Sequence, residues 1–370
     1  MSKREMLKIA LSVIALTVLI AVSAVQISMQ RASEAPQTLD GSMYGTEDDN
    51  GLETATIKRF GDAVALASST AFVAVNENGE KIIDEPISIN TPLLHSNGDY
   101  MALADEGGSG VWIYHGRDMC AHITTEEDIV GVRVNRSGTF AVATKKAGYK
   151  AEITVYKEDG TSLFRYLCGE ASFVDMDLSP DGSRLLLSSL KTDSTYSASL
   201  LLIPVHGGET SIVTLVEGEI FIGVRYNRDG SFLALGTARL DRYNADGSLK
   251  WTRDFSGKTL CDACLDDQDN IALAFETNAT SLLSGGANVE IYNRNGVLTG
   301  TYSAPGNIRS ITLCDNGIAV TYGKIVDIIS SRGELKKSAE ANTNIRSAAV
   351  FKSGRHVLIF GGGRAEILDI

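Results

Sequence analysis

The sequence predicts an all-β protein, and two properties of its composition point to this class. The chain has 370 residues, 44% of them apolar, which is enough to bury a large core and excludes a disordered chain. It contains 36 Gly but only 6 Pro, a combination typical of many short strands joined by tight turns. A repeated pattern of turn residues, the third observation, specifies the architecture.

A turn residue precedes an apolar run at regular intervals throughout residues 54–370. The series comprises Gly61, Gly98, Gly138, Gly182, Gly230, Asn270, Gly317 and Gly354. Gly and Asn tolerate the positive φ angles that tight hairpins require. Each of these positions therefore predicts a hairpin between the first and second strands of one repeated unit.

A second turn follows a bulky residue by four positions in most units. This series comprises Gly79, Gly160, Gly208, Gly247, Gly296 and Gly333, with Asp118 in the place of the glycine in one unit. Successive turns are 37 to 49 residues apart. A period near 40 residues with four short strands per unit is typical of the blades of a β-propeller.

One unit shows the expected strands in full, at residues 220–226, 232–236, 239–243 and 248–255. Seven such units are complete, and an eighth, 344–370, stops after its third strand. The count favours eight blades, with an N-terminal segment donating the missing strand. A seven-bladed ring with one displaced unit is the alternative.

The N-terminal region predicts a single transmembrane helix. Residues 9–29 carry no charge and are long enough to cross the hydrocarbon layer. Lys3, Arg4 and Lys8 precede this stretch, so the positive-inside rule places residues 1–8 in the cytoplasm and the rest of the chain outside. The alternative is a signal peptide cleaved after Ala24; both alternatives place the propeller outside the cytoplasm.

Residues 30–53 are polar and acidic, which predicts a flexible linker between the membrane and a propeller at 54–370. Beyond residue 30 the chain has 31 basic and 45 acidic residues, a net charge of −14. Nucleic-acid binding requires the opposite charge, so we expect no nucleic-acid partner.

Two segments carry a resemblance to known propeller repeats. The run 179–187, Ser-Pro-Asp-Gly-Ser-Arg-Leu-Leu-Leu, resembles the repeats of WD40-like and translocation-protein-type propellers. The run 244–251, which ends in Trp251, resembles those of pyrroloquinoline-quinone-type propellers. The whole layout is similar to uncharacterised bacterial families of membrane-anchored propellers, which implies a propeller held outside the cell by one helix.

The cysteines and histidines do not form a metal or cofactor motif. Cys261 and Cys264 lie on an expected inner strand, where residues three apart point to opposite faces, so we expect two small buried residues rather than a disulfide or half of a zinc site. His95, His115 and His206 occupy expected turn positions, which predicts exposure. We expect no cofactor, no metal and no catalytic set.

Loop lengths distinguish the two faces of the expected disc. The long segments 190–197 and 276–286 both connect second to third strands, and therefore lie on one face. Rigid scaffolds carry binding residues on such loops. This predicts a binding surface with Asp193, Tyr196 and Asn278 as candidate residues.

These observations predict a module that binds or scaffolds an envelope protein or glycan, anchored to the cell membrane. The alternative is an extracytoplasmic enzyme, such as a quinone-dependent dehydrogenase or a glycan-active enzyme. Its site would lie in the central channel, where the inner strands offer Arg133, Asp175, Asp177 and Arg225. A sensor that signals through the single helix would need a second membrane protein, because the cytoplasmic stub is too short to be a domain.

Overall fold

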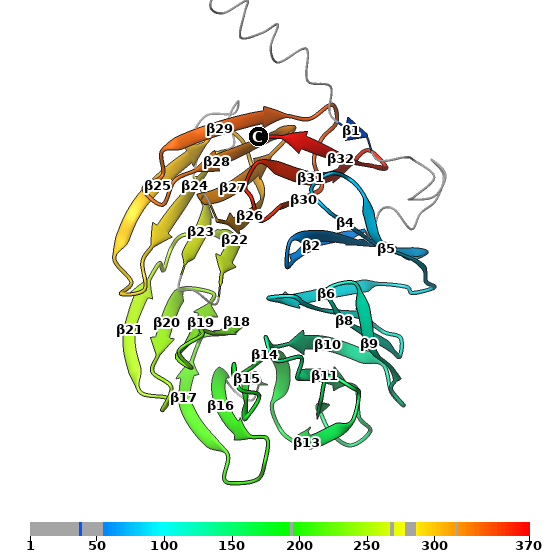
Figure 1. Ribbon diagram of the computed structural model, residues 1–370. Helices are drawn as coiled ribbons and strands as arrows, with labels where there is room; N and C mark the ends of the chain where they lie inside the picture. Colours follow the sequence, from blue (N-terminus) through cyan, green and yellow to red (C-terminus); the bar gives the residue numbers. More distant parts are fainter. Residues whose placement is uncertain (1–36, 39–54, 193–194, 267–269, 278–285, 316) are drawn as a thin grey trace, which may run out of the picture.

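The strands in the described part of the chain form a ring of eight four-stranded antiparallel sheets (Figure 1). The computed structural model describes residues 37–38, 55–192, 195–266, 270–277, 286–315 and 317–370. The expected all-β propeller with eight blades is confirmed, and the seven-bladed alternative is wrong.

Blades 1 to 7 each consist of four strands that are consecutive in the chain. Blades 1 and 2 comprise β2 (Thr56–Phe60), β3 (Ala63–Ala67), β4 (Ala71–Val75), β5 (Lys81–Pro86), β6 (Pro92–Asn97), β7 (Tyr100–Asp105), β8 (Gly110–His115) and β9 (Asp118–Thr124). Blades 3 and 4 comprise β10 (Ile129–Val134), β11 (Phe140–Thr144), β12 (Ala151–Tyr156), β13 (Ser162–Cys168), β14 (Ser172–Leu178), β15 (Arg184–Thr192), β16 (Tyr196–Pro204) and β17 (Ser211–Glu217). Blades 5 to 7 comprise β18 (Phe221–Tyr226), β19 (Phe232–Gly236), β20 (Arg239–Tyr243), β21 (Leu249–Asp254), β22 (Leu260–Leu265), β23 (Ile271–Glu276), β24 (Ala287–Tyr292), β25 (Leu298–Ala304), β26 (Ile308–Cys314), β27 (Gly317–Tyr322), β28 (Ile325–Ile329) and β29 (Leu335–Glu340).

Blade 8 joins the two ends of the chain. It contains β30 (Ser347–Val350), β31 (His356–Gly361), β32 (Arg364–Asp369) and the N-terminal strand β1 (Gln37–Thr38), in that order. The donated strand is thus confirmed, and the expectation that all of 30–53 is a linker is corrected at residues 37–38. Without β1, the edge of β32 would present unpaired backbone N–H and C=O groups.

The hydrophobic core is divided into eight clusters, one between each pair of neighbouring blades. The second strand of each blade lies between two such clusters, and all five residues of β3, for example, are buried. This explains why these strands are continuous apolar runs in the sequence. The ring closes where Leu358 and Phe360 of blade 8 pack against Ile57, Leu66 and Val75 of blade 1.

The first strands of the blades lie innermost, around the axis of the ring (Figure 1). We call the face that carries the first-to-second and third-to-fourth strand turns the hairpin face. Its turns are tight, as at Gly138, where φ is +81° and an added Cβ would lie 2.7 Å from the ring of Tyr100. The opposite face, which carries the second-to-third strand turns and the connections between blades, is called the link face.

Strand β1 takes the place of the fourth strand of blade 8 and runs antiparallel to the third strand, β32. The fourth strands of the other blades start at the hairpin face, so β1 starts there too. The expected transmembrane helix, residues 9–29, lies outside the described residues. Within the described ranges, the structure contains no helix that is long and apolar enough to span a bilayer.

Candidate functional site

Of the three binding residues that the sequence predicts, only Tyr196 lies in the described part of the chain. Its side chain is 47% exposed at the link face, and its hydroxyl donates a hydrogen bond to the Gly218 carbonyl at 3.1 Å. Asp193 and Asn278 lie outside the described residues. The structure therefore places one predicted site residue on the predicted face and leaves the set a prediction.

Tyr196 belongs to a strand rather than to a loop, which corrects the expectation for residues 190–197. Strands β15 and β16 each contain nine residues and pair as far as Thr192 and Tyr196. The second and third strands of the other blades contain five or six. At about 3.3 Å per residue, this hairpin of blade 4 extends roughly 10 Å beyond its counterparts, toward the link face.

A β-bulge interrupts the inner strand in five consecutive blades. In blades 3 to 7, one residue near the start of the strand is skipped in the pairing with the second strand. These residues are Val130, Val174, Ile222, Cys261 and Arg309. Inner strands start at the link face, so the bulges surround the axis there. A bulge re-aims the side chain of the extra residue, and those of Ile222, Cys261 and Arg309 are exposed.

The bulge corrects the expectation that Cys261 is buried, because regular strand alternation does not hold at this position. Cys261 is exposed, Cys168 is buried, and Cys120, Cys264 and Cys314 are partly buried. None of the five forms a disulfide with a described residue. Burial raises the pKa of Cys168 and Cys264 to about 11, so these two thiols are protonated at neutral pH.

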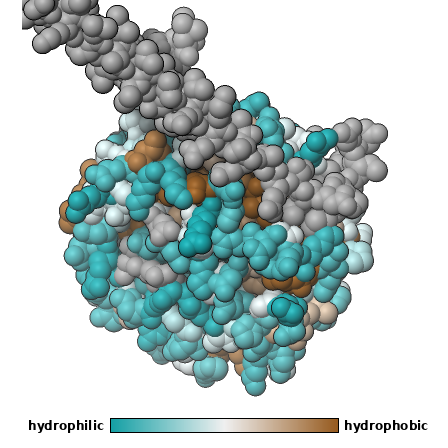
Figure 2. Space-filling view, turned by 45° about the horizontal axis from the view of Figure 1, so that its top comes forward, coloured by the Kyte–Doolittle hydropathy of each residue, from teal (hydrophilic) through white to brown (hydrophobic). Residues whose placement is uncertain are grey.

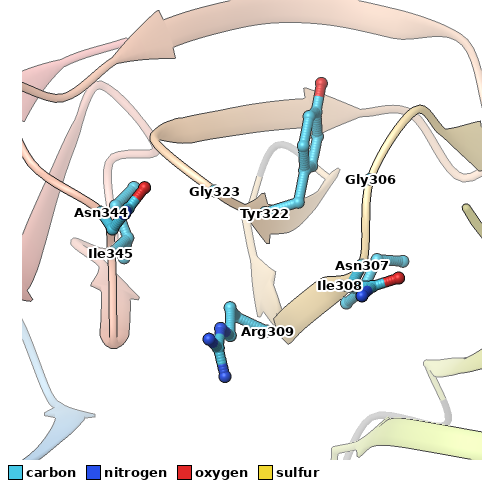
Figure 3. Close-up of a pocket in the computed structure, with 8 residues that line it drawn as sticks. All are labelled: Gly306, Asn307, Ile308, Arg309, Tyr322, Gly323, Asn344 and Ile345. Carbon is cyan, nitrogen blue, oxygen red and sulfur yellow. The ribbon is translucent and has the colours of Figure 1, made fainter. Parts of the chain in front are cut away.

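A pocket of about 430 Å³ lies at the link face between blades 7 and 8. It is formed by the connection before β26, the turn after β27 and the connection before β30. Figure 3 shows the ring of Tyr322 between Asn344 on one side and Asn307 on the other, with the side chain of Arg309 extending away from its strand. The pocket thus has two amides, one aromatic side chain and one cation in its lining, with the Tyr322 ring and the Arg309 side chain extending in opposite directions.

Side chains of different blades meet at the axis. Nε2 of His95, on blade 2, lies 2.8 Å from Nη1 of Arg225, on blade 5. Arg133 of blade 3 forms an ion pair with Asp175 of blade 4. His95 is 8% exposed on an inner strand, which corrects the expectation of an exposed turn residue.

The carboxylates at the axis connect neighbouring blades through backbone hydrogen bonds. Asp175 accepts the N–H of Val224, and Asp177 accepts the N–H of Tyr226, at 2.9 and 2.7 Å. Asp262 of blade 6 likewise accepts the N–H of Ile311, on blade 7, at 2.6 Å. Each carboxylate therefore joins two inner strands.

The enclosed position of these groups shifts their ionisation. Burial raises the pKa of Asp177 and of Asp262, because it disfavours the charged form. Burial lowers the pKa of His95 well below its usual value, and the cations Arg133, Arg225 and Lys58 lower it further. His95 is therefore neutral at physiological pH.

Lys58 of blade 1 completes the axial cluster. Water reaches its side chain, yet the surrounding strands partly desolvate the ammonium group and lower its pKa. Lys58 also interacts electrostatically with Cys264, Arg225 and Arg133. In the part of the chain that the structure describes, no group of three His, Cys, Asp or Glu side chains is arranged to hold a metal ion.

The fold and the axial cluster define this chain as an eight-bladed β-propeller protein with a charged axis. It belongs to a family of unknown function, DUF5711, whose model matches residues 42–370. No curated protein matches the chain.

Several solved structures share the fold at low sequence identity. Sqt1 of Saccharomyces cerevisiae has a TM-score of 0.59 and 11% identity, with 84% of this chain and 93% of that chain covered. BamB from Moraxella catarrhalis has a TM-score of 0.53 and 12% identity, with 85% and 96% covered. Sqt1 of Chaetomium thermophilum, solved bound to the N-terminus of the ribosomal protein L10, has a TM-score of 0.56 and 11% identity, with 84% and 94% covered. The resemblance to propeller proteins that the sequence indicates is thereby confirmed.

The sequence identified part of the axial cluster and missed the rest. Arg133, Asp175, Asp177 and Arg225 were recognised as inner-strand residues. Lys58 and His95 were not, although each lies three positions before a hairpin glycine, Gly61 or Gly98, and pairs across that hairpin: Lys58 with Ala65 and His95 with Ala102. Alignment of the units on their hairpin glycines would have placed both on inner strands.

Proposed function

We propose that this protein is a binding module that scaffolds a protein partner at the cell envelope, with the link face as the contact surface. The observation that carries this proposal is the exposure of side chains at the link face from four blades. Tyr196 projects on blade 4, and the bulge residues Ile222, Cys261 and Arg309 follow on blades 5, 6 and 7. These positions are neighbours around the ring.

The composition of this surface suits a mixed polar and apolar contact. Aromatic and Arg side chains are enriched at protein interfaces, and Tyr196 and Arg309 supply one of each. The side of the molecule that Figure 2 shows is mostly hydrophilic outside the grey residues, with apolar residues in small separate groups. Among proteins of the same fold, one Sqt1 structure is bound to the N-terminus of another protein, which supports a peptide or protein as the class of partner.

The course of β1 supports an anchored arrangement. A helix at 9–29 would precede β1, and the chain enters β1 at the hairpin face. With such an anchor, the hairpin face is turned toward the membrane and the link face away from it, open to a partner.

The contact surface can be tested with a photo-crosslinking amino acid placed in the full-length protein, in cells. We expect a single crosslinked partner from positions 196, 222 and 309. The matched control is position 334, since Glu334 is exposed in the third-to-fourth strand turn of blade 7, on the hairpin face. Equal crosslinking from position 334, or none from the link face, would contradict the proposal, and a glycan adduct would identify the alternative partner class.

Anchoring has a separate test. The full-length protein should stay in the membrane fraction after carbonate extraction, and a protease added outside the cytoplasm should cleave it. Release by carbonate, or full protection from that protease, would contradict the envelope location.

We propose a binding role over a catalytic one because the inner-strand carboxylates that an enzyme would use are engaged in structural contacts. Asp175 binds Arg133 and a backbone N–H, and both oxygens of Asp177 accept backbone N–H groups. No observation in the described residues favours the quinone-dependent or glycan-active alternative.

A further inference from the structure

Three cationic side chains reach the axis from three different blades. They are Lys58 of blade 1, Arg133 of blade 3 and Arg225 of blade 5, and Lys58 interacts electrostatically with both arginines. Like charges repel unless something between them compensates. The next question is therefore whether acidic groups of the protein balance the charge of these three cations.

The three carboxylates at the axis compensate the cations only in part. Asp175 forms an ion pair with Arg133. Asp177 and Asp262 direct both of their oxygens to backbone N–H groups, at 2.6 to 2.9 Å. Neither of these two forms an ion pair with Lys58 or Arg225, although Asp177 interacts electrostatically with Arg225 and Asp262 with Lys58.

His95 faces two donors, and a neutral imidazole can accept only one hydrogen bond. The N–H of Val134 donates to Nδ1 at 3.1 Å, which leaves the proton on Nε2. The Nε2–H group then lies 2.8 Å from Nη1 of Arg225, so two donors face each other and neither has an acceptor. In the opposite tautomer the proton is on Nδ1, and the two donors that face each other are Nδ1–H and the N–H of Val134.

The cluster therefore has more donors than acceptors. Lys58 forms no hydrogen bond or ion pair with any described residue, and buried Nε of Arg225 has no acceptor there. We propose that the propeller axis binds a small oxyanion, a carboxylate or phosphate group, through Lys58, Arg225 and the Nε2–H of His95.

An oxyanion meets each of these requirements. Its oxygens accept from the ammonium, the guanidinium and the imidazole N–H together, and bonds to charged donors are the stronger ones. The exposed side chain of Lys58 provides access from solvent. This site is independent of the link-face partner, since none of its three residues belongs to that surface.

Isothermal titration calorimetry of the full-length protein in detergent tests the site. Inorganic phosphate and acetate are titrated in separate experiments, at pH 7.5 and constant ionic strength in chloride, so that the two arms identify the preferred oxyanion. We expect saturable binding of at least one of them, weakened about tenfold or more by Lys58→Gln and by Arg225→Gln. The control is Lys81→Gln, which removes a lysine of the same blade that is paired with Asp84 on the outermost strand.

A second measurement covers the case in which a variant fails to fold. In the unmodified protein, the NMR signals of the His95 ring should shift on addition of the bound anion, while those of His206, in the turn after β16, should not. Absence of binding by both anions, or equal affinity of K58Q, R225Q and K81Q, would overturn the proposal.

Discussion

Truncation of a core leucine at the junction of blades 8 and 1 tests whether the ring is closed in solution. Leu358 of β31 is 1% exposed and packs against blade 1. Leu187 of β15 is its match, also a second-strand leucine, 1% exposed and in the cluster between blades 3 and 4. If the ring is closed, the two sites are physically equivalent, although only one joins the ends of the chain.

The magnitude follows from the complete burial of both side chains. A buried Leu→Ala substitution costs about 2 to 5 kcal/mol, through lost transfer free energy and a residual cavity. At about 2.1 cal/mol/K per residue, a body of this size has an unfolding entropy near 0.7 kcal/mol/K. Leu358→Ala and Leu187→Ala should therefore each lower Tm by about 3 to 8 °C.

Differential scanning calorimetry of the full-length protein provides the measurement. Leu335→Ala is the surface control, because Leu335 is 54% exposed on β29, and it should change stability by less than about 0.5 kcal/mol. The closed ring would be refuted if Leu358→Ala changed Tm no more than Leu335→Ala does, while Leu187→Ala lowered Tm by the expected amount.

Three further predictions concern the axis and the exposed thiol. Burial and neighbouring cations lower the pKa of His95 in the folded state, so the unfolded state binds more protons as pH falls through about 6.5. Tm should therefore fall from pH 7 to pH 5 more steeply for the unmodified protein than for His95→Gln. Parallel curves of Tm against pH would contradict this. Asp177 and Asp262, whose pKa is raised by burial, act in the opposite sense, which is why the difference between the two curves is the quantity to measure. Cys261 should be the first thiol modified by a maleimide in the native protein and Cys168 the last, as followed by mass spectrometry of peptides; equal rates would show that the bulge does not expose Cys261. Arg133→Ala should lower the free energy of unfolding in urea by about 1 to 2 kcal/mol. The reason is that Asp175 loses its ion-pair partner but retains the Val224 N–H and some contact with water. An unchanged free energy of unfolding would show that solvent already screens the ion pair.

The architecture was accessible from the sequence because the turns obey local rules. In blade 5 the expected second strand, 232–236, and third strand, 239–243, agree with β19 and β20 to the residue. The flanking glycines, Gly230 and Gly247, both have positive φ, so the chemistry of these turns is set by residues a few positions apart. The sequence likewise showed that the last unit, 344–370, has only three expected strands and therefore lacks a fourth.

The details of the site were less accessible, because they depend on departures from regular strands. The sequence predicts that Cys261 is a small buried residue of an inner strand, whereas the structure has a bulge at that position and the residue is exposed. Residues 190–197 read as a loop because they are polar, yet they pair as an extended hairpin up to Thr192 and Tyr196. Polar residues are compatible with a strand that projects into solvent, so composition could not decide between the two.

What the sequence determined by itself was the repeating unit, since each blade is specified by turn residues and apolar runs within about 40 residues of chain. It favoured eight units over seven, and the structure decided that number. Only the tertiary structure decided which inner-strand side chains meet. His95 and Arg225 are 130 residues apart and three blades apart, and they come into contact because closure of the ring brings all inner strands to one axis. The hydrogen bonds of Asp175, Asp177 and Asp262 to the next blade depend on the same closure, because neighbouring inner strands must be aligned before one can donate its N–H groups to the other.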